Sequence, residues 1–255
     1  MKVSLIQTSL AWENPEANRN NFSALIAGLN EPTDLIVLPE MFTSGFTMNP
    51  KAVAETMDGE TVAWMKQIAA EKDCAVTGSL VIKENGHHYN RMLFVLPDGE
   101  LQAYDKRHLF SLAGEEKEYK AGTEKLIVDY NGSKLCLLVC YDLRFPVFSR
   151  NTEGYDVMIY VASWPESRIF AWDSLLRARA IENMSYVIGV NRTGQDDDHY
   201  YHPGHSQVLD CLGADVLQAK SKEGIFTVEL DMDMQRETRE KFGFLEDRDT
   251  FTLQD

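Results

Sequence analysis

The sequence predicts an α/β fold in which two layers of β-sheet are covered by helices. In the first half of the chain, apolar runs typical of strands alternate with amphipathic stretches typical of helices, whereas in the second half several strands follow one another. No linker, low-complexity tract or short-period repeat separates the halves. With 255 residues, 44% of them hydrophobic and four of them tryptophan, the chain can bury one large core. One domain over 1–255 is the simplest organisation.

Strands in the first half are expected at 2–8, 34–38, 75–82 and 92–96, and helices at 15–30 and 60–73. The first helix carries Phe22, Ile26 and Leu29 on one stripe, as an amphipathic helix does. A polar turn at 84–88 joins the third and fourth strands. Residues 42–46 are aromatic with a glycine and are expected to form a loop over a pocket or simply a turn, and residues 114–122 are expected to form a charged loop.

The second half predicts strands at 126–130, 134–139, 156–162, 186–191, 207–209, 215–219 and 225–230. Helices are expected at 169–184 and 232–242. The tail at about 236–255 is acidic and basic by turns, which indicates a solvated helix and surface segment.

Charge and composition exclude several classes of protein. Asp and Glu total 40 against 25 Lys and Arg, so the net charge of −15 disfavours nucleic acid or an anionic membrane as partner. Neither a membrane span nor a secretory leader is visible, so a cytoplasmic location is expected. The four cysteines are scattered, unlike a disulfide framework. No glycine-rich dinucleotide fingerprint or phosphate loop follows a strand, so no nucleotide cofactor is expected.

The stretch KLCLLVCYDLRFP places Cys140 where a buried apolar strand turns into a polar loop. A thiol there can be held rigidly and meet backbone N–H groups, as a nucleophile requires, although many cysteines are simply inert and buried. Glu40 follows the strand at 34–38, and Lys106 lies among aromatic residues in YDKRHLF. A thiol nucleophile needs a base and a cation for the oxyanion, which these two residues could supply. Taken singly, each is more often simply a surface charge.

The three motifs LPEMF, YDKRHLF and LVCYDLRFP together resemble the nitrilase superfamily of carbon–nitrogen hydrolases, in the order and at the separations of that family. The resemblance extends from residue 2 to about residue 230. Within the superfamily, MFTSGF, DKRHLF and VCYDLRFPVFSRN are most similar to the bacterial omega-amidases, the 2-oxoglutaramate amidase group.

This resemblance implies a four-layer α-β-β-α sandwich, a homodimer or higher homo-oligomer, and hydrolysis without a cofactor. Glu40 would be the general base, Cys140 the nucleophile that forms a thioester, and Lys106 with the backbone N–H of Tyr141 the oxyanion site. The family's second glutamate matches Glu115, and the neighbouring Glu116 is the alternative. The implied reaction converts the terminal amide of 2-oxoglutaramate or 2-oxosuccinamate to the acid and ammonia.

The substrate end is less determined by the sequence. A small dicarboxylate mono-amide needs a cation opposite the thiol, for which Arg168 is the candidate, with Phe42 and Trp164 as walls. A helix-start surface arginine is an equally good interpretation of Arg168. Asp142 and Arg144 are expected to hold the loop after Cys140.

Other histidine patterns are interpreted as structural. His199, His202 and His205 recur every third residue, but Pro203 interrupts any helix and the spacing does not suit a tetrahedral metal site. His108 beside Lys106 allows a cysteine–histidine pair as the second choice.

Two other functions stay open at this point. One is another amidase of the superfamily, acting on deaminated glutathione or an N-carbamoyl amine. The other is a non-catalytic binding protein with the same fold, which an intact set of Glu40, Lys106 and Cys140 argues against.

Overall fold

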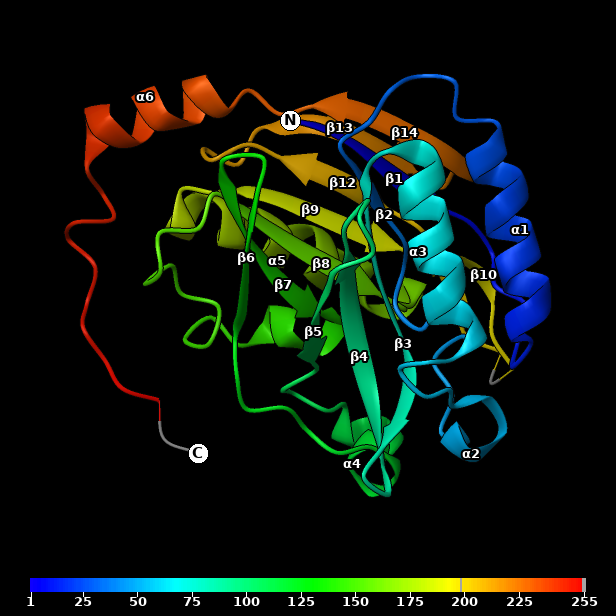
Figure 1. Cartoon of the computed structure of the whole chain (residues 1–255). Coiled ribbons are helices and arrows are strands. Elements are labelled where there is room, and N and C mark those ends of the chain that lie inside the picture. Colours follow the sequence, from blue (N-terminus) through cyan, green and yellow to red (C-terminus); the bar gives the residue numbers. More distant parts are fainter. Residues whose placement is uncertain (198, 254–255) are drawn as a thin grey trace.

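The computed structural model describes residues 1–197 and 199–253. Two six-stranded sheets pack face to face at its centre (Figure 1). The first sheet has the order β14 (Gly224–Glu229), β1 (Lys2–Gln7), β2 (Leu35–Val37), β3 (Ala75–Glu84), β4 (His87–Val95) and β5 (Leu101–Asp105). The second has the order β13 (Asp215–Lys220), β12 (Ser206–Leu209), β9 (Tyr186–Asn191), β8 (Val157–Ala162), β7 (Ser133–Val139) and β6 (Leu126–Tyr130).

Both sheets share one pairing pattern. In the first, β1, β2 and β3 are parallel, while β14, β4 and β5 pair antiparallel at the flanks. In the second, β7, β8 and β9 are parallel, and β6, β12 and β13 are antiparallel. Because parallel strands end at the same edge of a sheet, each sheet brings several loop starts together.

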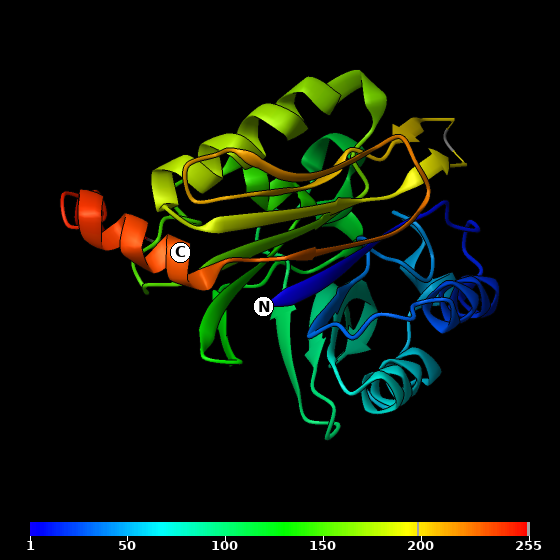
Figure 2. The ribbon, with the colours of Figure 1, turned by 90° about the horizontal axis from the view of Figure 1, so that it is seen from above.

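Helices cover the outer faces of both sheets. Figure 2 shows α5 (Ile169–Asn183) beyond the second sheet and, on the other side, α1 (Pro15–Ala27) and α3 (Glu60–Lys72) beyond the first. Along β1, Val3 and Leu5 pack between the sheets, whereas Ile6 packs toward the helices. Strands buried on both faces are apolar throughout, which explains the continuous runs in the sequence. The predicted α-β-β-α sandwich is confirmed.

Short elements were harder to predict. The predicted turn at 84–88 is in fact only Asn85 and Gly86, both with positive φ, so β4 begins at His87 and not at residue 92. A two-residue Asn-Gly turn matches the strand twist and needs no longer loop. The charged loop at 114–122 contains a single helical turn, α4 (Glu115–Glu118). Elements not predicted are α2 (Pro50–Val53), β5 (Leu101–Asp105), β10 (Thr193–Gln195), β11 (Tyr201–Pro203) and the 3₁₀ turns Ser111–Ala113, Cys140–Arg144 and Glu166–Arg168.

The C-terminal helix α6 (Met232–Phe242) begins at Asp231, whose carboxylate accepts the N–H of Met234 at 2.9 Å. Such a cap satisfies a donor that the first helical turn leaves free. Arg239 fixes the helix to the body of the molecule through Asp156, at 2.8 Å. Among the described residues, no helix has the length and apolar content that crossing a membrane would require.

Candidate active site

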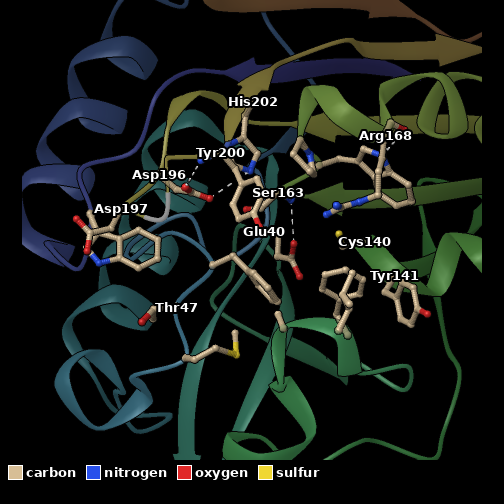
Figure 3. A pocket seen from close by; sticks show the side chains of 18 of the residues that line it. Glu40, Thr47, Cys140, Tyr141, Ser163, Arg168, Asp196, Asp197, Tyr200 and His202 are labelled. Carbon is tan, nitrogen blue, oxygen red and sulfur yellow. Dashed lines mark hydrogen bonds and ion pairs between the residues drawn. The ribbon is translucent and has the colours of Figure 1, made fainter.

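A cavity of about 850 Å³ lies where strand ends of both sheets meet. Glu40 reaches it from the loop after β2, and Lys106 from the residue after β5. Cys140 and Ser163 follow β7 and β8 of the second sheet. Figure 3 shows Glu40, Ser163 and Cys140 together, with Glu40 joined to Ser163 by a hydrogen bond. The structure thus brings together Glu40, Lys106 and Cys140, the three residues that the sequence selected.

Cys140 directly follows β7, has a positive φ of 44° and opens a 3₁₀ turn. This left-handed conformation is unfavourable for a residue with a side chain and occurs at functional sites, where the surroundings hold it. Asp142 supplies the support, because its buried carboxylate accepts the Val139 N–H at 2.9 Å and the Tyr104 hydroxyl at 2.7 Å. The hydrogen bonds of the buried Asp142 carboxylate therefore hold the loop that carries the Cys140 thiol.

Glu40, Lys106 and Glu115 form the charged cluster of the cavity. The Lys106 Nζ atom donates to Glu40 Oε1 at 3.0 Å and to Glu115 Oε1 and Oε2 at 3.0 and 2.9 Å. All three side chains are fully buried. Glu116 is exposed, so it is Glu115 that contacts the lysine.

The remaining oxygen of Glu40 accepts the backbone N–H of Ser163 at 2.9 Å. Because this bond joins the loop after β2 to the end of β8, it fixes the first sheet against the second at the reacting groups. Both carboxylate oxygens of Glu40 are thus bonded, which leaves the carboxylate little freedom to rotate.

Asn90 in β4 belongs to the same group, although the sequence gave no reason to select it. Its amide nitrogen donates to Glu40 Oε1 at 2.8 Å and to Glu115 Oε1 at 3.3 Å. Asn90 stands next to Arg91 and close to two histidines in the polar first half of β4, so its residue type carried no distinguishing signal.

Burial and charge act against each other in the charged cluster. Burial alone would lower the pKa of Lys106, but the carboxylates of Glu115 and Glu40 outweigh it and raise that pKa, so the ammonium is permanently charged. For Glu115, burial raises the pKa above its ordinary value, Lys106 opposes that shift, and Glu40 adds to it. Lys106 is therefore the charge that allows two carboxylates to share one buried site.

The pKa of the Cys140 thiol is raised well above its ordinary value, first by burial and second by the carboxylate of Glu40. Lys106 and the backbone N–H of Ser163 act in the opposite direction. The free protein consequently holds a neutral thiol near neutral pH, and a thiolate forms only when a base removes the proton. Glu40 is the carboxylate beside it.

Arg144, Arg168 and Trp164 line one side of the cavity, which we call the cation wall. The Arg144 guanidinium lies 5.0 Å from the Trp164 ring centre, and that of Arg168 lies 5.3 Å from the Phe110 ring centre. Within the described part of the chain, neither arginine has a carboxylate partner. Both leave N–H donors for an anionic ligand.

Phe42, expected as a cavity wall, lies elsewhere. It is fully buried among Phe22, Trp64 and other residues between the first sheet and its helices. The chain turns sharply at Met41, with a φ of 43°, and this turn directs the next side chain into the core. Trp164 does line the cavity, as does Tyr141, whose ring packs against Phe110.

The side of the cavity away from Arg168 in Figure 3 carries Asp196, Asp197, Tyr200 and His202. The sequence did not select this wall, because its residues lie in or beside the short strands β10 and β11, whose pairing was not predicted. Burial lowers the pKa of His202 to about 4, so it is neutral near pH 7.

The other histidine hypotheses can be placed as well. In the part of the chain that the structure describes, no cluster of three His, Cys, Asp or Glu side chains could hold a metal ion. His108 Nδ1 lies 2.8 Å from Asp142, and its ring stacks on Phe145 at 3.7 Å. It therefore supports the loop after Cys140, together with Asp142.

Residues 2–240 match the family model of the carbon–nitrogen hydrolases. The omega-amidase YafV of Escherichia coli K12 is 42% identical over 99% of this chain and 98% of its own length. The 2-oxoglutaramate amidase of Bacillus subtilis is 32% identical over 96% of each chain.

The crystal structure of XC1258 from Xanthomonas campestris, a member of the same superfamily with an arsenic adduct in its active site, is also similar. It is 42% identical, covers 100% of this chain and 99% of its own, and superposes with a TM-score of 0.97. Sequence, fold and the grouping of Glu40, Lys106 and Cys140 agree, and the chain belongs to the carbon–nitrogen hydrolase family of the nitrilase superfamily.

Proposed function

We propose that the protein is an omega-amidase, which hydrolyses the terminal amide of a small 2-oxo dicarboxylic acid mono-amide to the acid and ammonia. The substrate class is 2-oxoglutaramate or 2-oxosuccinamate. The full-length relatives with omega-amidase and 2-oxoglutaramate amidase activity support this class. The observation that carries the chemistry is the buried charged cluster beside a half-buried thiol at the cavity.

In the acylation step, Glu40 takes the proton of Cys140 as the sulfur attacks the amide carbonyl carbon. The oxyanion of the tetrahedral intermediate is stabilised by the Lys106 ammonium and by the backbone N–H of Tyr141. Glu40 then returns the proton to the amide nitrogen, the C–N bond breaks, and ammonia leaves a thioester on Cys140.

Deacylation repeats this sequence with water. Glu40 removes a proton from a water molecule, which attacks the thioester carbonyl carbon. The C–S bond then breaks, the Cys140 sulfur takes the proton back from Glu40, and the acid is released. Glu115 keeps Lys106 charged and in place throughout. The Lys106 Nζ atom donates to both oxygens of Glu115, and these bonds do not depend on whether Cys140 is a thiol or a thioester. No step requires a cofactor.

The cation wall provides the specificity. A 2-oxo dicarboxylate mono-amide carries its carboxylate at the end away from the amide, and Arg168 is the residue we assign to bind it, with Trp164 as the apolar wall. Arg144 is a second donor that the structure adds at the same wall. An arginine stacked on an aromatic ring is pre-oriented for a carboxylate, which lowers the entropic cost of binding.

Ammonia release measured with 2-oxoglutaramate, succinamate, an N-carbamoyl amine and a nitrile tests this function. Preference for 2-oxoglutaramate is expected. Preference for the N-carbamoyl amine or the nitrile would move the protein to another branch of the superfamily, and no turnover of any amide would refute the enzyme function.

We further propose a homodimer in the cytoplasm. Exposed apolar side chains on one surface of α5, Phe170 and Ile181, support a self-association surface, because such residues seldom stay in contact with water. All four cysteines are free thiols, which suits a reducing compartment. Sedimentation velocity at micromolar concentration tests the assembly, and a monomer there would refute it.

A further inference from the structure

Asn90 touches every member of the charged cluster. It is 1% exposed, and its amide nitrogen donates to both Glu40 Oε1 and Glu115 Oε1. Its main-chain oxygen accepts the backbone N–H of Lys106 at 3.0 Å. One residue of β4 thus sets the positions of two side chains and of the third residue's backbone.

The orientation of the Asn90 amide follows from charge. Its Oδ1 atom is buried and has no hydrogen-bond partner in the described structure. The opposite orientation would place that oxygen against two carboxylate oxygens, which repel it. The side chain therefore leaves one acceptor unpaired in order to donate twice, and an unpaired buried acceptor is itself unfavourable by about 1–3 kcal/mol.

We propose that Asn90 is a positioning residue that holds Glu40 and Glu115 at a fixed separation while keeping the charged cluster at a net charge of −1, the sum of two carboxylates and one ammonium. This inference rests on the proposed amidase function. A neutral amide adds donors without charge, so Glu40 stays a competent base. A cation at this position would weaken that base, and an anion would favour its protonated, inactive form.

A neutral donor also suits the proton cycle. When Glu40 receives the thiol proton, the negative charge moves to the sulfur and the net charge of the site is conserved. The Glu40 oxygen that carries no proton still accepts from an amide. Asn90 can therefore hold Glu40 in both protonation states, whereas an ion pair would weaken each time the carboxylate is protonated.

Two variants test the proposal with the full-length protein and 2-oxoglutaramate as substrate. Asn90→Asp has the same shape but adds a negative charge beside Glu40. It is expected to move the acid limb of the pH profile of kcat/KM up by about one to two pH units. Asn90→Ala removes both bonds without adding charge, and kcat is expected to fall by about 10- to 100-fold with KM nearly unchanged.

Asn183→Asp is the matched control. Asn183 is fully buried, is not among the residues that line the cavity, and accepts from Arg150 at 3.1 Å and from the Asn151 N–H at 2.8 Å, so an aspartate keeps these bonds. It should leave the pH profile at its wild-type position, because a buried carboxylate acts only on nearby titrating groups.

The outcomes separate the two proposals. A folded Asn90→Asp protein with a wild-type acid limb would overturn the role of Asn90, as would an Asn90→Ala protein that changes KM alone. If Asn90→Asp does not fold, the kcat of Asn90→Ala decides. Wild-type protein without amide turnover would instead refute the proposed function.

Discussion

The charged cluster and the cation wall differ in burial and in pairing. Glu40, Lys106 and Glu115 are fully buried, and every charged atom of theirs has a partner at hydrogen-bond distance. Arg144 and Arg168 of the cation wall lie on aromatic rings, are partly exposed, and have no carboxylate partner in the described structure. The charged cluster is complete before substrate arrives. The cation wall is completed only by a ligand.

This difference predicts how each region responds to change. A buried charge that loses its partner is strongly unfavourable, so a change in the charged cluster alters stability and kcat together. An exposed arginine costs little when removed, so a change in the cation wall alters KM and selectivity and leaves stability nearly unchanged.

Cys140→Ala is expected to have the largest effect. Without a nucleophile no thioester forms, so ammonia release from 2-oxoglutaramate should fall to the background rate. The melting temperature should stay within a few degrees of wild type, because the alanine fills nearly the same space. Residual turnover by well-folded Cys140→Ala protein would exclude the thioester route.

Lys106→Met should lower kcat by about 10³-fold, because the oxyanion loses its cation. It should also lower the free energy of unfolding near pH 8 by about 3–5 kcal/mol, because two carboxylates are left buried without a counter-charge. Urea unfolding followed by fluorescence measures the second effect.

The pH dependence of Lys106→Met has a defined sign. Burial and Glu40 raise the pKa of Glu115, and the variant lacks the ammonium that opposes this shift. The folded state then binds more protons than the unfolded state, so stability is greatest in acid and is lost as the pH rises through the folded-state pKa. A variant less stable at pH 5 than at pH 8 would contradict this account of the charged cluster.

The rate of Cys140 alkylation by iodoacetamide should rise by about tenfold per pH unit and continue to rise beyond pH 9.0, the ordinary pKa of a cysteine. Mass spectrometry of the modified peptide measures it. Cys140→Ala is the control for alkylation of the other cysteines, because burial also raises the pKa of Cys74, to about 11, and of Cys136. Their alkylation would therefore also become faster as the pH rises. A rate that levels off near pH 7 would indicate a preformed thiolate.

Arg168→Ala should raise KM for 2-oxoglutaramate by about 10- to 30-fold, the worth of one charged hydrogen bond, with kcat changed less. KM for butyramide, which has no carboxylate, should not change. Arg177→Ala is the matched control, because Arg177 lies on α5 and pairs with Asp215 away from this cavity. Equal losses on both substrates would remove Arg168 from carboxylate binding.

Phe42→Leu should have the smallest effect on activity, within about twofold, because the side chain lies in the core and not on the cavity. The free energy of unfolding should fall by about 1 kcal/mol as packing is lost. A selective rise in KM without loss of stability would restore Phe42 as a cavity wall.

The sequence predicted Glu40, Lys106 and Cys140 because each lies just after a strand inside a recognisable motif. The edge of a sheet brings such positions together. The choice between Glu115 and Glu116 depended on which side of a single helical turn faces inward, which no periodicity over four residues reveals.

What the sequence did not predict depends on contacts between distant segments. The Asn90 side chain in β4 contacts the charged cluster because its amide is directed toward Glu40. The Phe42 side chain is directed into the core because the chain bends at Met41. The cavity wall with Asp196, Asp197, Tyr200 and His202 lies in and beside two three-residue strands, β10 and β11. Such short strands carry too few residues for an alternating pattern to be detected.

The hydrogen bond between Glu40 and the Ser163 N–H joins two parts of the chain that could be prepared as separate fragments. Residues 1–122 hold Glu40, Lys106, Glu115 and Asn90, and residues 126–253 hold Cys140 and the cation wall. A fragment that ends before β6 carries the proposed base without the proposed nucleophile, and the remaining fragment carries the nucleophile without the base. Because β14 of the second fragment pairs with β1 of the first, turnover recovered by mixing the two fragments would measure how accurately this strand and the second sheet dock onto the first fragment.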